Sequence, residues 1–67
     1  MQWVPVKSNW VQDVAYQDNS LFTRLRDGST YRYLLVPQFK YQALIQHDSA
    51  GTYINEEIKP HHEVVEI

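Results

Sequence analysis

The stretch LFTRLRDGSTYRYLL, residues 21–35, decides the fold, because it predicts two strands joined by a tight turn at Asp27-Gly28. The pairing register of this hairpin matters, since a slip of one residue moves every side chain of a strand to the other face. A two-residue loop would mix arginines and tyrosines on one face. A three-residue loop, Arg26-Asp27-Gly28, with Gly28 in the left-handed conformation of a bulge, puts both remaining arginines outside. We therefore predict the three-residue loop, which also explains the glycine.

This register divides the hairpin into two chemically distinct faces. The inner face, turned toward the helices, is predicted to hold Leu21, Thr23, Leu25, Tyr31, Tyr33 and Leu35. The outer face is predicted to hold Phe22, Arg24, Thr30, Arg32 and Leu34.

The segments that flank the hairpin also favour strands. Val11–Gln17 alternates loosely and is joined to the hairpin by the short polar loop Asp18–Ser20. Gln2–Val6 predicts a short strand at an edge, because Pro5 lacks a backbone donor. Near the C-terminus, Val64, Val65 and Ile67 have strand propensity. We expect this segment either to pair with Trp3–Val6 or to be mobile.

Two helices are predicted between the hairpin and this C-terminal segment. Pro37–His47 begins with a proline suited to a first helical turn, and its apolar stripe consists of Tyr41, Leu44 and Ile45. Ala50–Ile58 can be capped by Ser49 and ended by Pro60, and its stripe consists of Ala50, Tyr53, Ile54 and Ile58. The fold class is therefore α+β: an antiparallel meander of three or four strands with two short helices on one face.

Length and composition limit the possible functions. The chain has 67 residues, which predicts one domain, with a core from Val6 to Lys59 and a tail at 60–67. It has no cysteine, which fits a cytoplasmic location, and it has no apolar run of membrane-spanning length. The net charge of −2 argues against a protein that coats duplex nucleic acid, although a local basic patch is compatible with it.

The order and spacing of several short motifs resemble the KTSC domain, a small bacterial family that also occurs at the C-terminus of certain lysyl-tRNA synthetases. The residues that carry the resemblance are Val6-Lys7-Ser8, Tyr16, Leu21, Asp27-Gly28, Tyr31-Arg32-Tyr33, Val36-Pro37, Tyr41, Leu44, Ser49–Asn55 and Ile58-Lys59. The resemblance implies RNA binding, which the synthetase context suggests, and structural roles for Tyr31, Tyr33, Pro37, Tyr53 and Asn55. The sequence departs from the family pattern at Asn9, at Lys59 and at His61-His62, and the last two departures reduce the positive charge.

Each candidate binding residue has a structural alternative. Tyr31 and Tyr33 could stack on bases, but their inward register favours a core role. The outer-face residues Phe22, Arg24, Arg32 and Leu34 could contact RNA or a protein partner, or form a solvated surface whose arginine stems cover apolar groups. Ser49 and Gly51 could bind an anion at a helix start, but a capped turn that allows close packing is favoured.

No catalytic or metal site is predicted. His61 and His62 are adjacent, and adjacent histidines rarely point at one ion, so we expect a surface tail and no metal or other cofactor. The letters of His47-Asp48-Ser49 match a catalytic triad, but contiguous residues do not converge as a triad does. The sequence therefore predicts a non-catalytic module that contacts RNA, or alternatively a protein-interaction module that acts by edge-strand pairing or homodimerisation, and no membrane contact.

Overall fold

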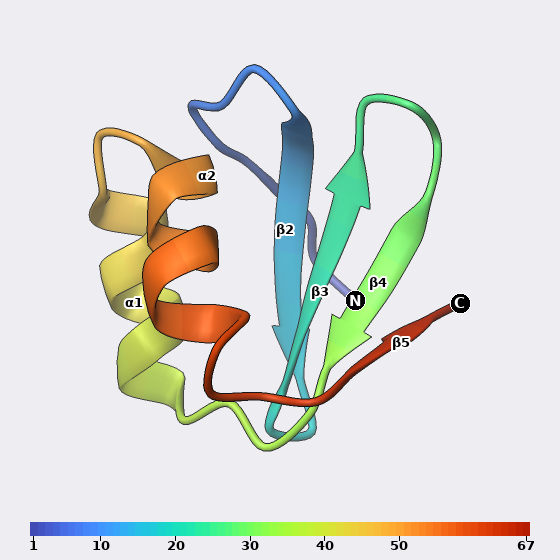
Figure 1. The fold of residues 1–67 in the computed structure, drawn as a ribbon, viewed down its shortest axis with the longest axis vertical. Coiled ribbons are helices and arrows are strands. Elements are labelled where there is room, and N and C mark those ends of the chain that lie inside the picture. Colours follow the sequence, from blue (N-terminus) through green and yellow to red (C-terminus); the bar gives the residue numbers. More distant parts are fainter.

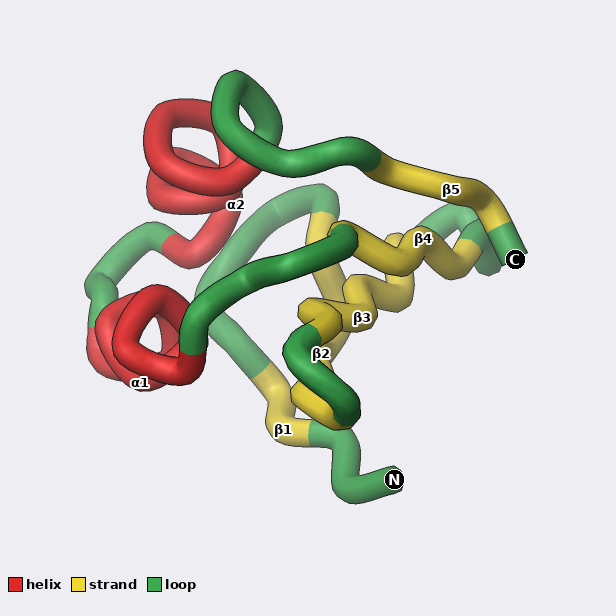
Figure 2. Tube along the Cα trace, turned by 90° about the horizontal axis from the view of Figure 1, so that it is seen from below, coloured by secondary structure: helices red, strands yellow, loops and turns green.

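Five antiparallel strands form one open sheet in the computed structural model, which describes residues 1–67. The strands follow chain order across the sheet: β1 (Val4–Pro5), β2 (Val11–Gln17), β3 (Ser20–Leu25), β4 (Thr30–Tyr33) and β5 (Val64–Glu66). The helices cover one face of this sheet and leave the other uncovered (Figure 1 and Figure 2). The α+β class is thus confirmed, with one strand more than the three or four expected.

The β3–β4 hairpin has the predicted register. Leu21 pairs with Tyr33, and the amide of Leu25 donates to the carbonyl oxygen of Ser29 at 2.8 Å. Gly28 has φ = 96°, in the left-handed region that favours glycine. The three-residue loop is therefore confirmed, and β4 turns its tyrosines inward and Arg32 outward.

Leu35 does not lie on the inner face, and that part of the prediction was wrong. Its side chain is 81% exposed, and its backbone has φ = 53°. The strand alternation used for the prediction no longer applies here, because β4 ends at Tyr33 and the chain turns away from the sheet. The next residue, Val36, is fully buried, and its carbonyl oxygen accepts a 2.6 Å hydrogen bond from the Tyr16 hydroxyl.

The β2–β3 turn is shorter than expected. Asp18 and Asn19 have φ of 54° and 57°, which is the geometry of a two-residue turn that matches the twist of a hairpin. Ser20 was expected in this loop but begins β3 and is buried. Within β2, a register shift between Val11 and Asp13 adds one residue to the strand, so that Val11 and Val14 both reach the core.

The C-terminal segment is part of the sheet. In β5, Val65 pairs with Arg32 and Glu66 with Tyr31, so the segment neither pairs with Trp3–Val6 nor hangs free of the sheet. β1 forms the opposite edge, as Figure 2 shows. The C-terminal segment can reach the edge of the sheet at β4 but not the edge at β1, because only residues 59–63 link the last helix to β5.

The helical layer consists of α1 (Gln38–Gln46) and α2 (Ala50–Tyr53), and α2 continues into a π-helix, η1 (Ile54–Ile58). Both predicted helical segments are confirmed with shifted bounds, since the extended Pro37 precedes α1 rather than lying in its first turn. The core between the layers contains Val11, Val14, Leu21, Tyr33, Val36, Leu44, Ala50, Ile54 and Ile58. None of the helices has the length and apolar character needed to cross a membrane.

Candidate functional site

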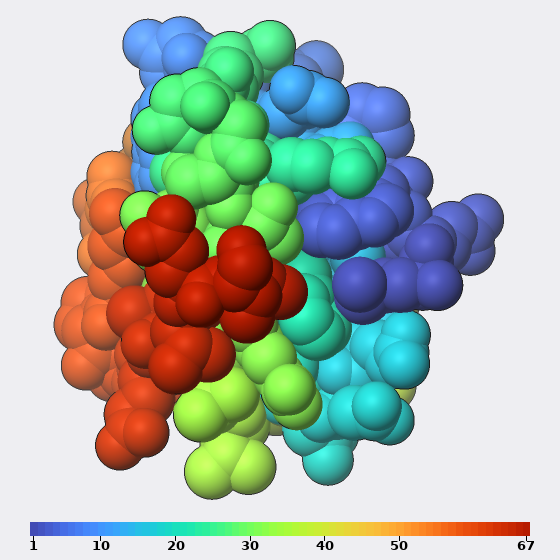
Figure 3. Space-filling model, turned by 90° about the vertical axis from the view of Figure 1, so that its right-hand side faces the viewer, coloured from blue at the N-terminus to red at the C-terminus, as the bar shows by residue number.

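The uncovered face of the sheet carries three of the outer residues predicted from the hairpin, Phe22, Arg24 and Arg32. The fourth, Leu34, lies just past the end of β4 and lines a hollow together with Arg32. This face extends onto β5, because the strand register places Val65 opposite Arg32. Figure 3 shows this side of the molecule, with the N-terminal residues in dark blue and β5 in red on either side of β3 and β4 side chains. We call the surface formed by these residues the outer patch.

Arg24 is held by two partners on this face. Its Nε and one terminal nitrogen donate to the two carboxylate oxygens of Asp13, at 2.9 and 2.6 Å. Its guanidinium lies 4.2 Å from the ring centroid of Trp3. The hydrogen bond to Asp13 raises the pKa of Arg24, and the pair compensates the arginine's charge. Arg24 is thus a rigid, stacked group with little free charge for an external anion.

Arg32 has no carboxylate partner. Its Nε donates to the Ser20 hydroxyl at 2.9 Å, and its guanidinium lies 5.6 Å from the ring centroid of Phe22. The terminal nitrogens are available to a ligand. Arg32 is therefore the outer-face cation best able to hold a phosphate beside an aromatic ring.

A hollow of ≈ 480 Å³ adjoins Arg32 at the end of the patch. Its lining consists of two leucines and six polar or charged residues, with both donors and carboxylates among them: Leu34, Leu35, Asp18, Ser20, Arg32, His61, His62 and Glu63. The ring of His62 is fixed there, because its Nδ1 donates to the carbonyl oxygen of Leu34 and its Nε2 accepts from the Lys40 ammonium, both at 3.1 Å. Burial and the nearby Lys40 charge lower the pKa of His62. No three acidic or histidine side chains come together in a metal-binding arrangement.

Ser49 and Gly51 lie in the helical layer, away from the outer patch. Gly51 is buried against Trp10, and a Cβ on it would lie 2.2 Å from the indole Nε1. The amide of Ala50 donates to the carbonyl oxygen of Lys7, so this N–H group of the turn is not free to bind an anion. The geometry supports the packing role for the Gly51 turn over anion binding.

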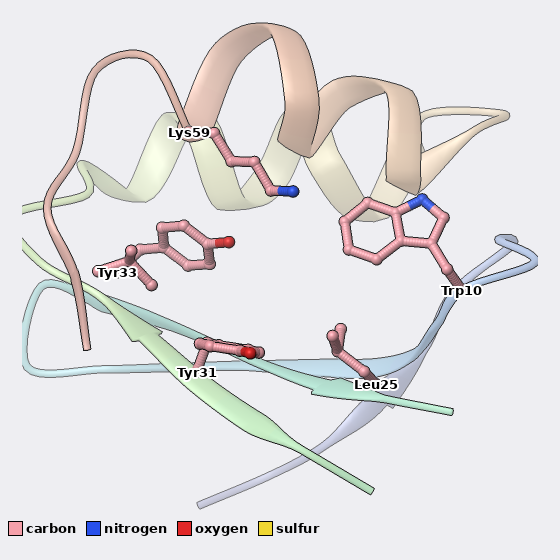
Figure 4. Close-up of a pocket in the computed structure, with 6 residues that line it drawn as sticks. Trp10, Leu25, Tyr31, Tyr33 and Lys59 are labelled. Atoms are coloured by element: carbon pink, nitrogen blue, oxygen red, sulfur yellow. The ribbon is translucent and has the colours of Figure 1, made fainter. Parts of the chain in front are cut away.

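A second concave site lies between the sheet and the end of η1. This pocket has a volume of ≈ 370 Å³ and is lined by Trp10, Leu25, Tyr31, Tyr33, Lys59 and Val64. The Lys59 ammonium lies 4.7 Å from the ring centroid of Trp10. In Figure 4 Tyr31, Tyr33 and Lys59 lie around one central space, into which the Tyr33 hydroxyl and the Lys59 ammonium project. We expected the tyrosine pair to be core residues, and Tyr33 is indeed buried, but both also line this pocket.

The structure also shows the surroundings of the remaining motif residues. Pro37 directly precedes α1, and Tyr53 packs against the core, with its ring centroid 5.7 Å from that of His47. Asn55 is exposed on η1. The hydroxyl oxygen of Ser8 accepts hydrogen bonds from the backbone amides of Trp10 and Val11, at 3.1 and 3.0 Å. These bonds fix the turn that positions the indole of Trp10.

Comparison with known proteins shows the family of the chain. A family model described as the KTSC domain matches residues 7–62. The chain belongs to the KTSC domain family. An uncharacterised protein of Stutzerimonas stutzeri (strain A1501) is 33% identical over 64 residues, which cover 92% of this chain and 90% of that protein. The crystal structure of a KTSC domain protein from Yersinia pestis superposes with a TM-score of 0.90 at 31% identity, covering 98% of this chain and 96% of that one.

The KTSC motifs that suggested the family occupy two kinds of position. Lys7 and Ser8 tie the β1–β2 connection to α2 and to the start of β2 through the hydrogen bonds given above. Tyr31, Tyr33 and Lys59 instead meet around the pocket, although Lys59 is far from the tyrosines in sequence. Sequence reasoning missed this convergence, and also missed Trp3 and Trp10, because no local pattern reports contacts between residues so distant along the chain.

Proposed function

We propose that this KTSC domain is a non-catalytic, cytoplasmic module that binds single-stranded RNA weakly on the uncovered face of its sheet. The observation that carries the proposal is the Arg32 guanidinium, which has no carboxylate partner and lies 5.6 Å from the ring centroid of Phe22. A guanidinium beside a partly exposed ring, such as that of Phe22, can hold a phosphate while a base stacks nearby, without requiring a particular sequence.

The same contacts limit the expected affinity. Because Asp13 compensates Arg24, we expect one or two phosphate contacts, centred on Arg32. Each contact with a single strand contributes about −0.7 to the slope of log affinity against log salt, so we expect a slope between about −0.7 and −1.4. Such a module would act as an accessory to another RNA-binding protein.

The test is a fluorescence-anisotropy titration of a labelled single-stranded RNA at low salt. Arg32→Glu should abolish binding, whereas Lys7→Glu, the same charge change at an exposed residue near the helices, should leave it nearly unchanged. Phe22→Ala should weaken binding, and Phe39→Ala, a matched change of a phenylalanine that is 70% exposed on α1, should not. If the parent protein fails to bind RNA at low salt, the proposal is wrong.

The edge of β5 supports a second candidate, a protein-interaction module. Val64, Val65 and Ile67 are 47%, 46% and 64% exposed, and β5 is an edge strand whose outer side has no strand partner. An apolar free edge is suited to adding a strand from another chain or a second copy. Sedimentation over a range of concentrations separates the candidates: a concentration-dependent dimer that Val65→Lys removes would favour edge pairing, and a monomer throughout would exclude homodimerisation.

A further inference from the structure

The pocket between η1 and the sheet is independent of the outer patch. Side chains alternate along β4, so Arg32 faces the outer patch while Tyr31 and Tyr33 face the helical layer and the pocket. A ligand in the pocket and an RNA strand on the outer face would therefore lie on opposite sides of the same strand.

The lining of the pocket favours a small, largely apolar ligand. Five of the six lining residues are hydrophobic, and three of these are aromatic. The volume, ≈ 370 Å³, lies near the lower end of the range for small-molecule sites. The indole nitrogen of Trp10 abuts Gly51 in α2, so Trp10 offers the pocket its ring rather than its N–H group. A flat, apolar group of one or two rings matches these walls.

The polar groups at the pocket converge on one space and are suited to an oxyanion. The hydroxyl of Tyr33 and the ammonium of Lys59 point toward it in Figure 4, and Tyr31 lines it from the sheet side. Neither hydroxyl takes part in the hydrogen bonds of the chain, and no buried polar side-chain atom lacks a partner, so both hydroxyls are accessible, on residues that line the pocket. Burial and the neighbouring Tyr31 raise the pKa of Tyr33, which keeps that phenol protonated and able to donate.

The charge of the lining distinguishes between possible ligands. Lys59 is the only charged residue among the six, so the pocket matches one negative charge. A ligand cation would meet the Lys59 ammonium, which already lies over the Trp10 ring. A phosphate dianion would have one charge in excess. A carboxylate matches both the single charge and the hydrogen-bond donors.

We propose that this pocket binds a small aromatic carboxylate. The ring of the ligand lies against Trp10 and the apolar wall formed by Leu25 and Val64. The carboxylate accepts hydrogen bonds from the hydroxyls of Tyr31 and Tyr33 and pairs with the Lys59 ammonium.

The two tryptophans of the chain provide the readout. Phenylacetate is titrated into the full chain while two-dimensional NMR follows the indole N–H signals of Trp10, at the pocket, and Trp3, on the outer face. We expect a saturable shift of the Trp10 signal and none of the Trp3 signal. Phenylacetamide, which has the same ring without the charge, should bind about tenfold more weakly or worse, since it loses a charge-assisted hydrogen bond. Equal binding of the acid and the amide, or a shift confined to Trp3, would overturn the proposal.

Variants assign the carboxylate contacts. Lys59→Gln should weaken phenylacetate binding by about tenfold or more, and Lys59→Arg should retain it. Lys59 is exposed, so both variants should fold. Tyr33→Phe keeps the ring and should weaken binding, whereas Arg32→Glu on the outer face should not affect it. Unchanged affinity in Lys59→Gln, or binding of inorganic phosphate as tight as that of phenylacetate, would contradict a carboxylate site.

Discussion

Gly51→Ala gives a sharp test of how the helical layer meets the sheet. Gly51 is buried in α2, and a Cβ built on it would lie 2.2 Å from Nε1 of Trp10 and 3.0 Å from the Ser8 hydroxyl oxygen. The indole cannot move away freely, because the Trp10 amide is hydrogen-bonded to Ser8 and its ring faces Lys59. Either the ring or the whole of α2 must shift to admit the methyl group.

Two opposing effects set the size of the change. Alanine is favoured over glycine by about 1 kcal/mol in a helix interior, and by less in a first turn, where Gly51 lies. Overpacking of a well-packed site costs about 1–3 kcal/mol, and a contact of 2.2 Å to a fixed ring belongs at the upper end of that range. We therefore expect Gly51→Ala to lower the free energy of unfolding by about 1–2 kcal/mol. With a urea m-value of about 1 kcal/mol per molar for so small a domain, the midpoint should fall by about 1–2 M.

A double-mutant cycle with Trp10→Phe isolates the steric contact. The smaller ring removes the clashing nitrogen, so Gly51→Ala should be about 1 kcal/mol less harmful in the Trp10→Phe background than in the parent. Gly28→Ala is the matched control. A Cβ there meets nothing within 4 Å, yet φ is 96°, so the loss of about 1 kcal/mol comes from the backbone alone and should not depend on Trp10. A rise in the urea midpoint of Gly51→Ala, as helix propensity alone predicts, would refute the packing argument.

Three further changes test other parts of the fold. Tyr33→Ala should destabilise by on the order of 3 kcal/mol in urea unfolding, because it removes a buried aromatic side chain, and a loss below about 1 kcal/mol would contradict its core role. Leu35→Gly should stabilise by about 0.5 kcal/mol, since glycine relieves the left-handed backbone at φ = 53° and the leucine is exposed; a lower midpoint would show that Leu35 makes contacts of its own. Because the pKa of His62 is lower in the folded chain than its ordinary value of about 6.5, the unfolded chain takes up its proton first as the pH falls. His62 therefore supports stability fully above about pH 6.5 and loses this contribution below it, so His62→Gln should flatten the pH dependence of the urea midpoint there, and an unchanged profile would be evidence against the shift.

The sequence specified the hairpin because its local chemistry allows few alternatives. Gly28 marks the residue that takes the left-handed backbone conformation. Only a three-residue loop puts Arg24 and Arg32 on the face of the hairpin opposite the tyrosines. The end of β4 could not be predicted in the same way. Alternation in the sequence continues through Leu35, but the chain must turn there to bury Val36, and no residue at that turn favours a positive φ.

Contacts between distant segments were the part of the site that local patterns did not reveal. The outer residues of β3 and β4 follow from one register, so their common face was predictable from the hairpin alone. The partner of Arg24 depends on the pairing of β2 with β3, which a bulge shifts by one residue at Asp13. The C-terminal segment pairs with β4 because of where η1 ends in space. Strand propensity does not report that position.

The Tyr31-Arg32-Tyr33 motif connects both proposed sites to one backbone feature. Its strand has a side-chain period of two, so the register that places Arg32 beside Phe22 necessarily turns both tyrosines toward Lys59. A slip of one residue would expose two aromatic rings and bury a guanidinium without a carboxylate, and the core opposes both changes. The same burial that stabilises the fold through Tyr33 thus fixes the orientation of the outer arginine and of the pocket hydroxyls. The spacing of the motif is explained by the requirements of the two faces of β4, whichever of the two sites proves to bind a ligand.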